Sequence, residues 1–323
     1  MVDEKCLILI KIYKMNRKEF LATTFAAGLG LAFVPSLVNC SSSKIVSQQL
    51  FEPLKLSAGN LAKVVGNVSR YTNKGGTVGI FETKDGFVVI DSQFPDSIQP
   101  VLDGISGKGK PVLYLCNTHH HGDHTSGNIA FKDPNTKIIA HKRVPELQRL
   151  AAEKSNKLAE QRYASILFED RYKIDLGNQK ITGYHFGNGH TFGDVMYHFE
   201  NDNVVHMGDL MFTNMIPVYR TADGSDSRNW IKILEKAQAT FDNDTVFIFG
   251  HGNKPEFTTG NKSNLKEMAN FLEASNEFVY GNMLAGISTE KILEKHQFIP
   301  GFENRKTPER FAGFLDELRK TLS

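Results

Sequence analysis

Residues 62–91 alternate apolar and polar positions in the way that half-buried strands do. Three segments carry the pattern: Ala62–Tyr71, Thr77–Thr83 and Phe87–Asp91. An apolar/polar period of two is typical of β-strands, so we predict a strand for each segment. Lys84-Asp85-Gly86 lies between the last two, and this turn chemistry predicts a hairpin.

The rest of the pattern predicts further strands and helices. Helical spacing of apolar residues falls at 96–106, 144–161, 227–239, 263–280, 288–295 and 307–322. Strand patterns fall at 112–117, 137–140, 172–176, 180–186, 195–200, 204–207 and 245–249. Two batches of strands, each followed by helices, favour an α+β fold with two sheets face to face and helices outside. No linker interrupts residues 57–323, so we expect one domain there.

The first forty residues follow a different pattern. A short charged start, Met15–Phe20, precedes the uncharged stretch Leu21–Val38, which is followed closely by Cys40. This order is typical of a secretory signal. The cysteine after the apolar run resembles a bacterial lipobox, and Arg17–Leu21 resembles a twin-arginine export motif. The first resemblance implies cleavage before Cys40 and acylation of its thiol.

These features predict that the body of the protein leaves the cytoplasm. We expect residues 1–40 to be the export segment, with 1–14 as an upstream extension, and 41–56 to be a polar tether. The expected location is the periplasm or the outer membrane, as an anchored bacterial lipoprotein. An N-terminal membrane anchor that is never cleaved is the alternative. We expect no other membrane contact.

Charge and cysteine use narrow the class of function. The chain has 38 Lys and Arg against 36 Asp and Glu. Residues 1–39 hold five of the Lys and Arg and three of the Asp and Glu. The remainder is formally neutral, whereas nucleic-acid binders usually carry a basic excess, so we expect a small-molecule substrate and no nucleic acid. Cys116 is the single cysteine after Cys40, and its apolar strand pattern predicts a buried thiol rather than a nucleophile.

A loop at residues 117–128, NTHHHGDHTSGN, concentrates four histidines and one aspartate in six positions. His119 and His121 are two apart, a spacing that points both rings to one side of an extended segment. Gly122 then lets the chain turn before Asp123 and His124. A catalytic zinc ion needs three protein ligands and an open position, so this loop supplies too few ligands by itself.

Further candidate ligands lie just beyond later apolar runs, each beside a glycine. They are His190 in GNGHTFGD, Asp209 in HMGD and His251 in FGHG. Because strand ends at one edge of a sandwich converge, we expect these residues to meet the histidine loop. Five imidazoles and two carboxylates in one cleft would be costly without a metal, which favours a metal centre over scattered histidines.

The four motifs HxHxDH, GHTxGD, GD and GHG, in this order over about residues 75–254, resemble those of the metallo-β-lactamase superfamily. The resemblance implies a four-layer αβ/βα sandwich with a two-metal site between the sheet edges. It implies the following ligands: His119, His121 and His190 for the first metal; Asp123, His124 and His251 for the second; and Asp209 as a bridge.

The expected cofactor is two Zn(2+) per chain, with iron or manganese as the alternative. Two zinc ions that share a water would lower its pKa from about 15.7 toward 7, and the bridging hydroxide would attack a carbonyl carbon. Asp123 is the predicted catalytic residue, because it would steer that water and pass on its proton.

The residue at position 209 directs the choice of branch. β-Lactamases with a zinc-bound cysteine have Cys at this position, and those with an all-His/Asp site generally lack the bridging aspartate. Asp209 therefore resembles the glyoxalase II and lactonase branches, and we predict hydrolysis of a small ester, lactone, thioester or amide. The alternatives are a β-lactamase, a mono-iron persulfide dioxygenase that uses His119, His190 and Asp209, and a metal-binding lipoprotein without turnover.

Several neighbours are expected to support the site. Asp194 is predicted to orient a ligand or cap a turn, and Asp91 to hydrogen-bond the histidine loop or serve a turn. His120 is expected beside the ligands or exposed. Met211, Phe212, Met215, Ile216 and Tyr219 follow Asp209 and are expected to be core more than pocket wall.

Overall fold

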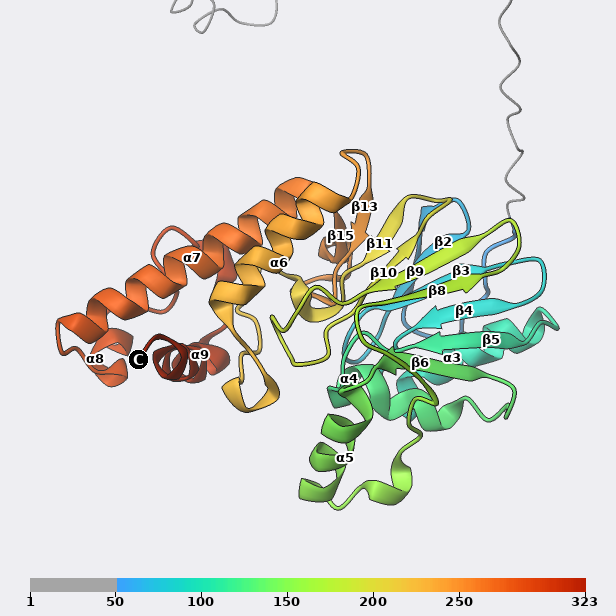
Figure 1. The fold of residues 1–323 in the computed structure, drawn as a ribbon, viewed down its shortest axis with the longest axis horizontal. Coiled ribbons are helices and arrows are strands. Elements are labelled where there is room, and N and C mark those ends of the chain that lie inside the picture. The colour runs from blue at the N-terminus through green and yellow to red at the C-terminus, as the bar shows by residue number, and fades with distance from the viewer. Residues whose placement is uncertain (1–50) are drawn as a thin grey trace, which may run out of the picture. The chain divides into compact units, whose positions relative to one another are not determined.

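Two β-sheets lie face to face at the centre of the fold, and helices cover their outer sides (Figure 1). A computed structural model describes residues 51–323, so the predicted export segment and most of the predicted tether lie outside the described residues. None of the helices between residues 51 and 323 has the length and apolar character needed to cross a bilayer.

The first sheet has seven strands in chain order. They are β1 Asn60–Val65, β2 Val68–Thr72, β3 Val78–Glu82, β4 Phe87–Ile90, β5 Val112–Cys116, β6 Lys137–His141 and β7 Ile166–Phe168. The pairs from β1 to β4 are antiparallel and those from β4 to β7 are parallel. The parallel pairs require crossovers, and β4 reaches β5 through helix α3, Pro95–Gly107.

The second sheet has the order β15-β13-β11-β10-β9-β8. Its strands are β8 Arg171–Asp175, β9 Lys180–Tyr184, β10 Met196–Phe199, β11 Val204–His206, β13 Val246–Ile248 and β15 Thr259–Gly260. Two short strands, β12 Phe212–Thr213 and β14 His251–Gly252, pair in parallel beside it.

The remaining helices are α4 Gly122–Thr125, α5 Val144–Lys154, α6 Ser227–Thr240, α7 Lys262–Leu284, α8 Thr289–Leu293 and α9 Pro308–Leu322. The Asp226 side chain caps α6 by accepting from the backbone N–H of Asn229 at 3.0 Å, and Asn261 caps α7. Such caps satisfy backbone donors that have no partner within the helix. In Figure 1, α6 and α7 run side by side, and α8 and α9 lie beyond them.

Alternating residues of the central strands build the layers. On β4, Val88 and Ile90 join the core between the sheets, whereas Phe87 and Val89 pack with α3 on the outer side. A third core joins the second sheet to α6, α7 and α9. Because strand side chains alternate between faces, each buried strand contributes to two cores. The predicted α+β, four-layer αβ/βα sandwich is confirmed.

Three local predictions differ from the structure. The single strand predicted over 62–71 is a hairpin, because Gly66 adopts a φ of 51° and reverses the chain between β1 and β2. The helix predicted over 144–161 ends at Lys154, where Asn156 takes the left-handed φ of 55°. The short strand β7 was not predicted. Within the segment expected to be a tether, Leu54 and Leu56 pack against the α3 core.

Candidate metal centre

All seven predicted ligands converge at one edge of the two sheets. His119 follows β5, and His121 precedes the short helix α4, which carries Asp123 and His124. His190 lies in the loop after β9, Asp209 in a single 3-10 turn after β11, and His251 opens β14. The strand ends place these side chains together although they span more than 130 positions of the chain.

His119, His121, His190 and Asp209 form the first group of converging ligand atoms. One ligand atom from each residue lies within 4.8 Å of the others. His190 Nε2 is 2.9 Å from His121 Nδ1, and Asp209 Oδ2 is 3.8 Å from His119 Nε2 and 3.5 Å from His190 Nε2.

Asp123, His124 and His251 form the second group, again within 4.8 Å. His251 Nε2 is 3.0 Å from Asp123 Oδ2 and 3.4 Å from His124 Nε2. Asp209 borders this group too, because its Oδ1 is 3.1 Å from His124 Nε2 and its Oδ2 is 3.3 Å from His251 Nε2. One carboxylate therefore faces both groups.

The donor set fits metal ions. His119 Nε2 is buried and has no hydrogen-bond partner, an arrangement that is costly in the metal-free protein. His190 Nε2 and His121 Nδ1 point at each other, and three nitrogens with one carboxylate oxygen match the ligand types and number of a zinc site. The second group, with Asp209, offers two nitrogens and two carboxylates, which suits zinc, iron or manganese.

Asp91 anchors the histidine loop from behind. Its Oδ2 accepts hydrogen bonds from His124 Nδ1 and from Thr118 Oγ1, each at 2.7 Å, and its Oδ1 accepts from the Thr118 backbone N–H at 2.7 Å. The carboxylate is fully buried. The predicted hydrogen bonding between Asp91 and the loop is confirmed, and because Asp91 accepts from His124 Nδ1, His124 Nε2 is free to face the second group.

Asp194 holds the loop that carries His190. Its Oδ2 accepts from the backbone N–H of Gly189 at 3.0 Å and of His190 at 2.8 Å, and its Oδ1 accepts from Thr191 Oγ1 at 2.6 Å. This confirms the supporting role predicted for Asp194. His120, predicted beside the ligands or exposed, is buried, with Nε2 3.9 Å from Asp223 Oδ1.

Asp223 is a site residue that the sequence analysis missed. It closes the 3-10 turn Thr221–Asp223, and its Oδ2 accepts from His121 Nε2 at 3.0 Å. This bond places the ring proton of His121 on Nε2 and leaves Nδ1 to face the first group. The local sequence, an aspartate before a glycine in a polar stretch, is an ordinary turn signal, so only the tertiary contact identifies it.

Two glycines are required where the backbone approaches the ligands. A Cβ on Gly250 would lie 2.0 Å from Asp209 Oδ1, and a Cβ on Gly76 would lie 2.1 Å from the His124 ring. Both distances are shorter than any normal contact, so each side chain can hold its position only beside a glycine.

The two groups differ in their affinity for protons. Burial, and then the neighbouring histidines, lower the pKa of His119 and His190, so both rings are neutral at pH 7. Burial also acts to lower the pKa of His251, but Asp209 and Asp123 outweigh it and raise that pKa to about 9. Burial likewise acts to lower the pKa of His124, but Asp209, Asp123 and Asp91 raise it well above its usual value, so without metal the second group holds extra protons.

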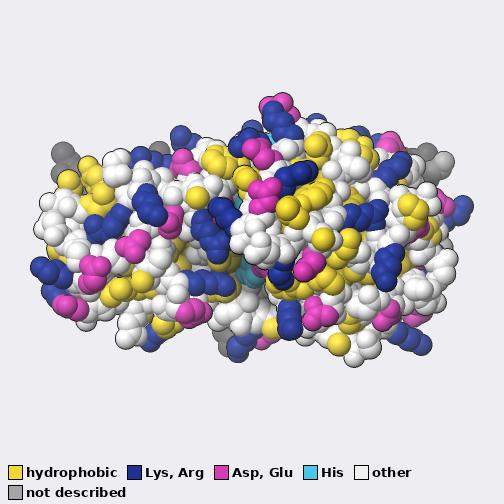
Figure 2. Space-filling view, turned by 90° about the horizontal axis from the view of Figure 1, so that it is seen from below, with side chains coloured by type: hydrophobic (Ala, Val, Ile, Leu, Met, Phe, Trp, Pro, Cys, Tyr) yellow, Lys and Arg dark blue, Asp and Glu magenta, His cyan; other side chains and the backbone are white. Residues whose placement is uncertain are grey.

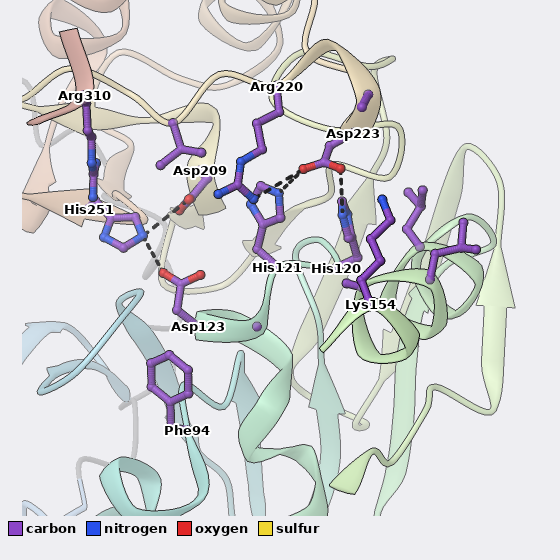
Figure 3. A pocket seen from close by; sticks show the side chains of 16 residues that line it. Phe94, His120, His121, Asp123, Lys154, Asp209, Arg220, Asp223, His251 and Arg310 are labelled. Carbon is purple, nitrogen blue, oxygen red and sulfur yellow. Dashed lines mark hydrogen bonds and ion pairs between the residues drawn. The ribbon is translucent and has the colours of Figure 1, made fainter. Parts of the chain in front are cut away.

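A pocket of about 680 Å³ opens over the centre, a size typical of small-molecule sites. His121, Asp123, Asp209, Asp223 and His251 line its floor (Figure 3). The hydrophobic residues after Asp209 lie elsewhere: Met211, Phe212, Ile216 and Tyr219 are buried and Met215 packs on them, as predicted.

Comparisons with known proteins identify the family of this fold and site. The model of the family described as "Metallo-beta-lactamase superfamily" matches residues 71–251. Hydroxyacylglutathione hydrolase of Pelagibacter ubique is 27% identical over 124 residues, 37% of this chain and 44% of the relative. The hydroxyacylglutathione hydrolase of Rhizobium meliloti is 27% identical over 168 residues, which cover 50% of this chain and 56% of the relative. The chain spans about half the length of these curated relatives.

Solved structures share the fold. A metallo-beta-lactamase from Pontibacter korlensis superposes with a TM-score of 0.53 at 22% identity, over 67% of this chain and 99% of that one. A stereoselective inverting sec-alkylsulfatase from Pseudomonas sp. superposes with a TM-score of 0.64 at 13% identity, over 82% of this chain and 50% of that one. The family match covers more than half of the chain and includes every converging ligand, and the protein is therefore a member of the metallo-beta-lactamase superfamily.

Proposed function

We propose that the protein is a metal-dependent hydrolase that cleaves a small ester, lactone, thioester or amide. The observation that carries the proposal is the position of Asp209, whose two oxygens lie 3.1–3.8 Å from ligand nitrogens of both groups. A carboxylate placed in this way suits two adjacent metals. Each would be held by one group, and we propose zinc for both.

The reaction would use the chain's own groups in three roles. Bound metals would supply Lewis acidity and lower the pKa of water toward 7. Asp123 lines the pocket, and although burial acts to raise its pKa, His124 and His251 hold that pKa well below its usual range. Asp123 is therefore ionised in the metal-free protein. As a carboxylate of the pocket, it would orient the attacking water and accept its proton at Oδ2.

The other residues fix the geometry of the site. Asp223 orients His121 and Asp91 orients His124, so the rings present defined nitrogens without rearrangement. Such preorganisation reduces the cost of assembling the reacting geometry. The hydroxyacylglutathione hydrolases to which the chain is similar support the choice of acyl-transfer chemistry and, among the proposed substrates, a thioester.

The proposal is tested by metal content and by a substrate panel. We expect two zinc ions per chain by mass spectrometry of the purified protein, and turnover of one class among esters, lactones, thioesters and amides. One iron per chain would favour the persulfide dioxygenase, and turnover of β-lactams alone would favour the β-lactamase. A fully metallated protein with no turnover on any panel would contradict the hydrolase.

His121→Ala tests the assignment of the site. Removal of this ring takes one ligand from the first group, so we expect loss of about one metal per chain and a fall in kcat of at least about 100-fold. His296→Ala changes a histidine whose ring packs on Phe278, outside the site, and serves as the control. Full activity of His121→Ala with unchanged metal content would contradict the two-metal arrangement.

We also propose that the protein is exported and anchored through Cys40. The proposal is supported by the charged start, the apolar stretch and the cysteine in residues 15–40. Cells fed a labelled fatty acid should incorporate it into the wild-type protein and not into Cys40→Ser. Labelling of neither protein, with the chain recovered in the cytoplasm, would contradict the proposal.

A further inference from the structure

Three cationic side chains surround the pocket above the metal centre. They come from separate elements: Lys154 from the end of α5, Arg220 from the loop before the turn that holds Asp223, and Arg310 from the first turn of α9. Figure 2 shows a histidine at the bottom of a hollow, with Lys and Arg side chains on both of its rims. Separate elements have thus brought positive charge to one opening.

The acidic residues of the pocket are already engaged. Asp209 and Asp123 face the ligand histidines, and Asp223 accepts from His121 at 3.0 Å. Arg220 reaches Asp223 at 3.7 Å and is 62% exposed, so this contact neutralises it only in part. The pocket therefore has cationic groups that its own carboxylates do not balance.

Arg310 is the best placed of the three cations. Its side chain is half-buried, and its Nη1 donates to the backbone carbonyl of Ile216 at 3.3 Å, which holds the guanidinium in place. Among residues 51–323 it has no carboxylate partner. It lines the same pocket as His251 of the second group, and in the view of Figure 3 the two are drawn on the same side of the pocket. A guanidinium with unused donors in a pocket is suited to bind a carboxylate through two parallel hydrogen bonds.

Helix α5 adds an apolar part to the lining of the pocket. Leu150 and Ala151 follow Leu147 on α5 by three and four residues, so both lie next to it on the helix surface, and all three line the pocket. We refer to them as the α5 apolar face. Leu150 is 45% exposed although it is a large hydrophobic residue. An apolar side chain exposed inside a pocket gains from contact with an apolar part of a ligand.

We propose that the pocket selects an anionic, partly apolar substrate. Arg310 binds a carboxylate or a similar anionic group of the substrate, and the α5 apolar face contacts its hydrocarbon part. The anionic group then lies on the side of His251, and the bond to be cleaved lies over the metal centre. This inference rests on the proposed hydrolase function of the same site. Lys154 and Arg220 attract the anion to the opening.

A pair of esters that differ by one carboxylate tests the selection during turnover. 4-Nitrophenyl pentanoate is neutral, and mono-4-nitrophenyl adipate adds a terminal carboxylate to the same chain. On the zinc-loaded protein we expect a KM for the adipate about tenfold lower, the size expected for one charge-assisted contact. Arg310→Gln should raise the KM for the adipate by about tenfold and so remove this difference. Arg310→Lys should restore part of it.

A binding measurement separates the inference from the proposed function. Hexane-1-sulfonate is an anionic amphiphile that binds metals weakly, and hexan-1-ol is its neutral counterpart. Calorimetry on the zinc-loaded protein should give about tenfold tighter binding of the sulfonate, lost in Arg310→Gln. Lys306→Gln is the matched control, because Lys306 is an exposed cation four residues away that does not line the pocket.

The two measurements give distinct outcomes. Ester hydrolysis with equal KM values for both esters, and sulfonate binding unchanged in Arg310→Gln, would overturn the inference and leave the hydrolase standing. Sulfonate binding that depends on Arg310, without hydrolysis of any ester, would support the anion site while contradicting ester hydrolysis. If Lys306→Gln weakened sulfonate binding as much as Arg310→Gln, general surface charge would explain the affinity, and the inference would also be overturned.

Discussion

At the scale of single residues, three carboxylates define how the histidines of the centre are used: Asp91 and Asp209 are buried, and Asp223 is half-buried. Asp91 fixes His124, Asp223 fixes His121, and Asp209 faces both groups of ligands. His124 and His121 each donate a ring proton to a carboxylate, Asp91 or Asp223, and present the other nitrogen to the candidate metal site. Asp91 and Asp223, which hydrogen-bond candidate ligands, are therefore needed for the arrangement of the site as much as the ligands themselves.

Asp223→Asn tests the support of His121. The amide is uncharged and can present its N–H₂ instead of an acceptor, so His121 Nε2 loses a charge-assisted acceptor and the ring orientation is less defined. We expect the affinity of the first zinc to fall by about 10- to 100-fold. Competition with a chromophoric chelator measures this. Asp85→Asn, in the exposed turn before β4, should leave the affinity unchanged; an equal effect of both variants would argue against the role of Asp223.

The dependence of metal binding on pH should differ between the two groups. Because the pKa of His251 is raised to about 9, this ring is protonated in the metal-free protein at pH 7 and must lose its proton to bind a metal. The pKa values of His119 and His190 are lowered, so at pH 7 no proton competes with a metal for their ring nitrogens. We expect the affinity of the second site to rise with pH up to about 9.

The measurement is calorimetry of zinc binding in buffers of different ionisation enthalpy. Because the pKa values of both His124 and His251 are raised, we expect about one to two more protons released from the second group than from the first at pH 7. Equal proton release from both sites would contradict the difference in pKa. The affinity of the first site should show the weaker rise over the same interval of pH.

At the scale of elements, the site depends on loops that run close to one another at the strand ends. Gly250 lies between β13 and β14, and its backbone N–H donates to the Gly208 carbonyl at 2.8 Å, beside Asp209. Thr77, just before β3, donates to the Gly250 carbonyl through its backbone N–H at 2.8 Å. These contacts join both sheets directly beneath the ligands.

Gly250→Ala and Gly313→Ala should have opposite effects. A Cβ at 250 would lie 2.0 Å from Asp209 Oδ1, whereas a Cβ at 313, inside α9, meets nothing within 4 Å. We expect Gly250→Ala to lower the free energy of unfolding by about 1–3 kcal/mol and to reduce metal binding. Gly313→Ala should raise it by about 0.5–1 kcal/mol through helix propensity. Chemical denaturation checks both, and destabilisation by Gly313→Ala would contradict the packing described for α9.

At the scale of the whole molecule, the metal centre lies where both sheets and the C-terminal helices meet. The first sheet supplies the histidine loop, the second supplies Asp209 and the loop of His190, and α9 supplies Arg310 to the same pocket. Metals bound there would connect segments from β5 to β14. Ligands that bind only the folded protein stabilise it in proportion to their affinity.

Removal of metal should therefore lower the stability of the entire fold. We expect a chelator to lower Tm by at least about 5 °C, since metals held at about 1,000 times their Kd contribute about 4 kcal/mol. Thermal denaturation with and without chelator measures this, and added zinc should restore Tm. In His121→Ala the shift should be smaller, because one metal is already lost. An unchanged Tm in the wild-type protein would indicate that the centre does not bind metal tightly.

The sequence by itself determined the layers and the candidate ligands that converge at the sheet edge. Apolar alternation in β3 and β4 predicts buried strands because the period of two is local, and glycine-flanked His190, Asp209 and His251 predict converging ligands because each follows a strand. The same pattern did not predict the turn at Gly66, because that turn depends on the backbone φ of one glycine and not on the alternation of apolar residues. The split into β1 and β2 therefore needed the structure.

Only the tertiary structure decided which residues complete the site. Asp223 lies 102 positions from His121 and Arg310 lies 59 positions from His251, and neither belongs to a recurring local pattern. Their positions follow from how the loop after β12 and the helix α9 pack across the opening. Local sequence sets the spacing of side chains along an element, whereas contacts between elements depend on packing of the whole chain, and substrate selection belongs to those contacts.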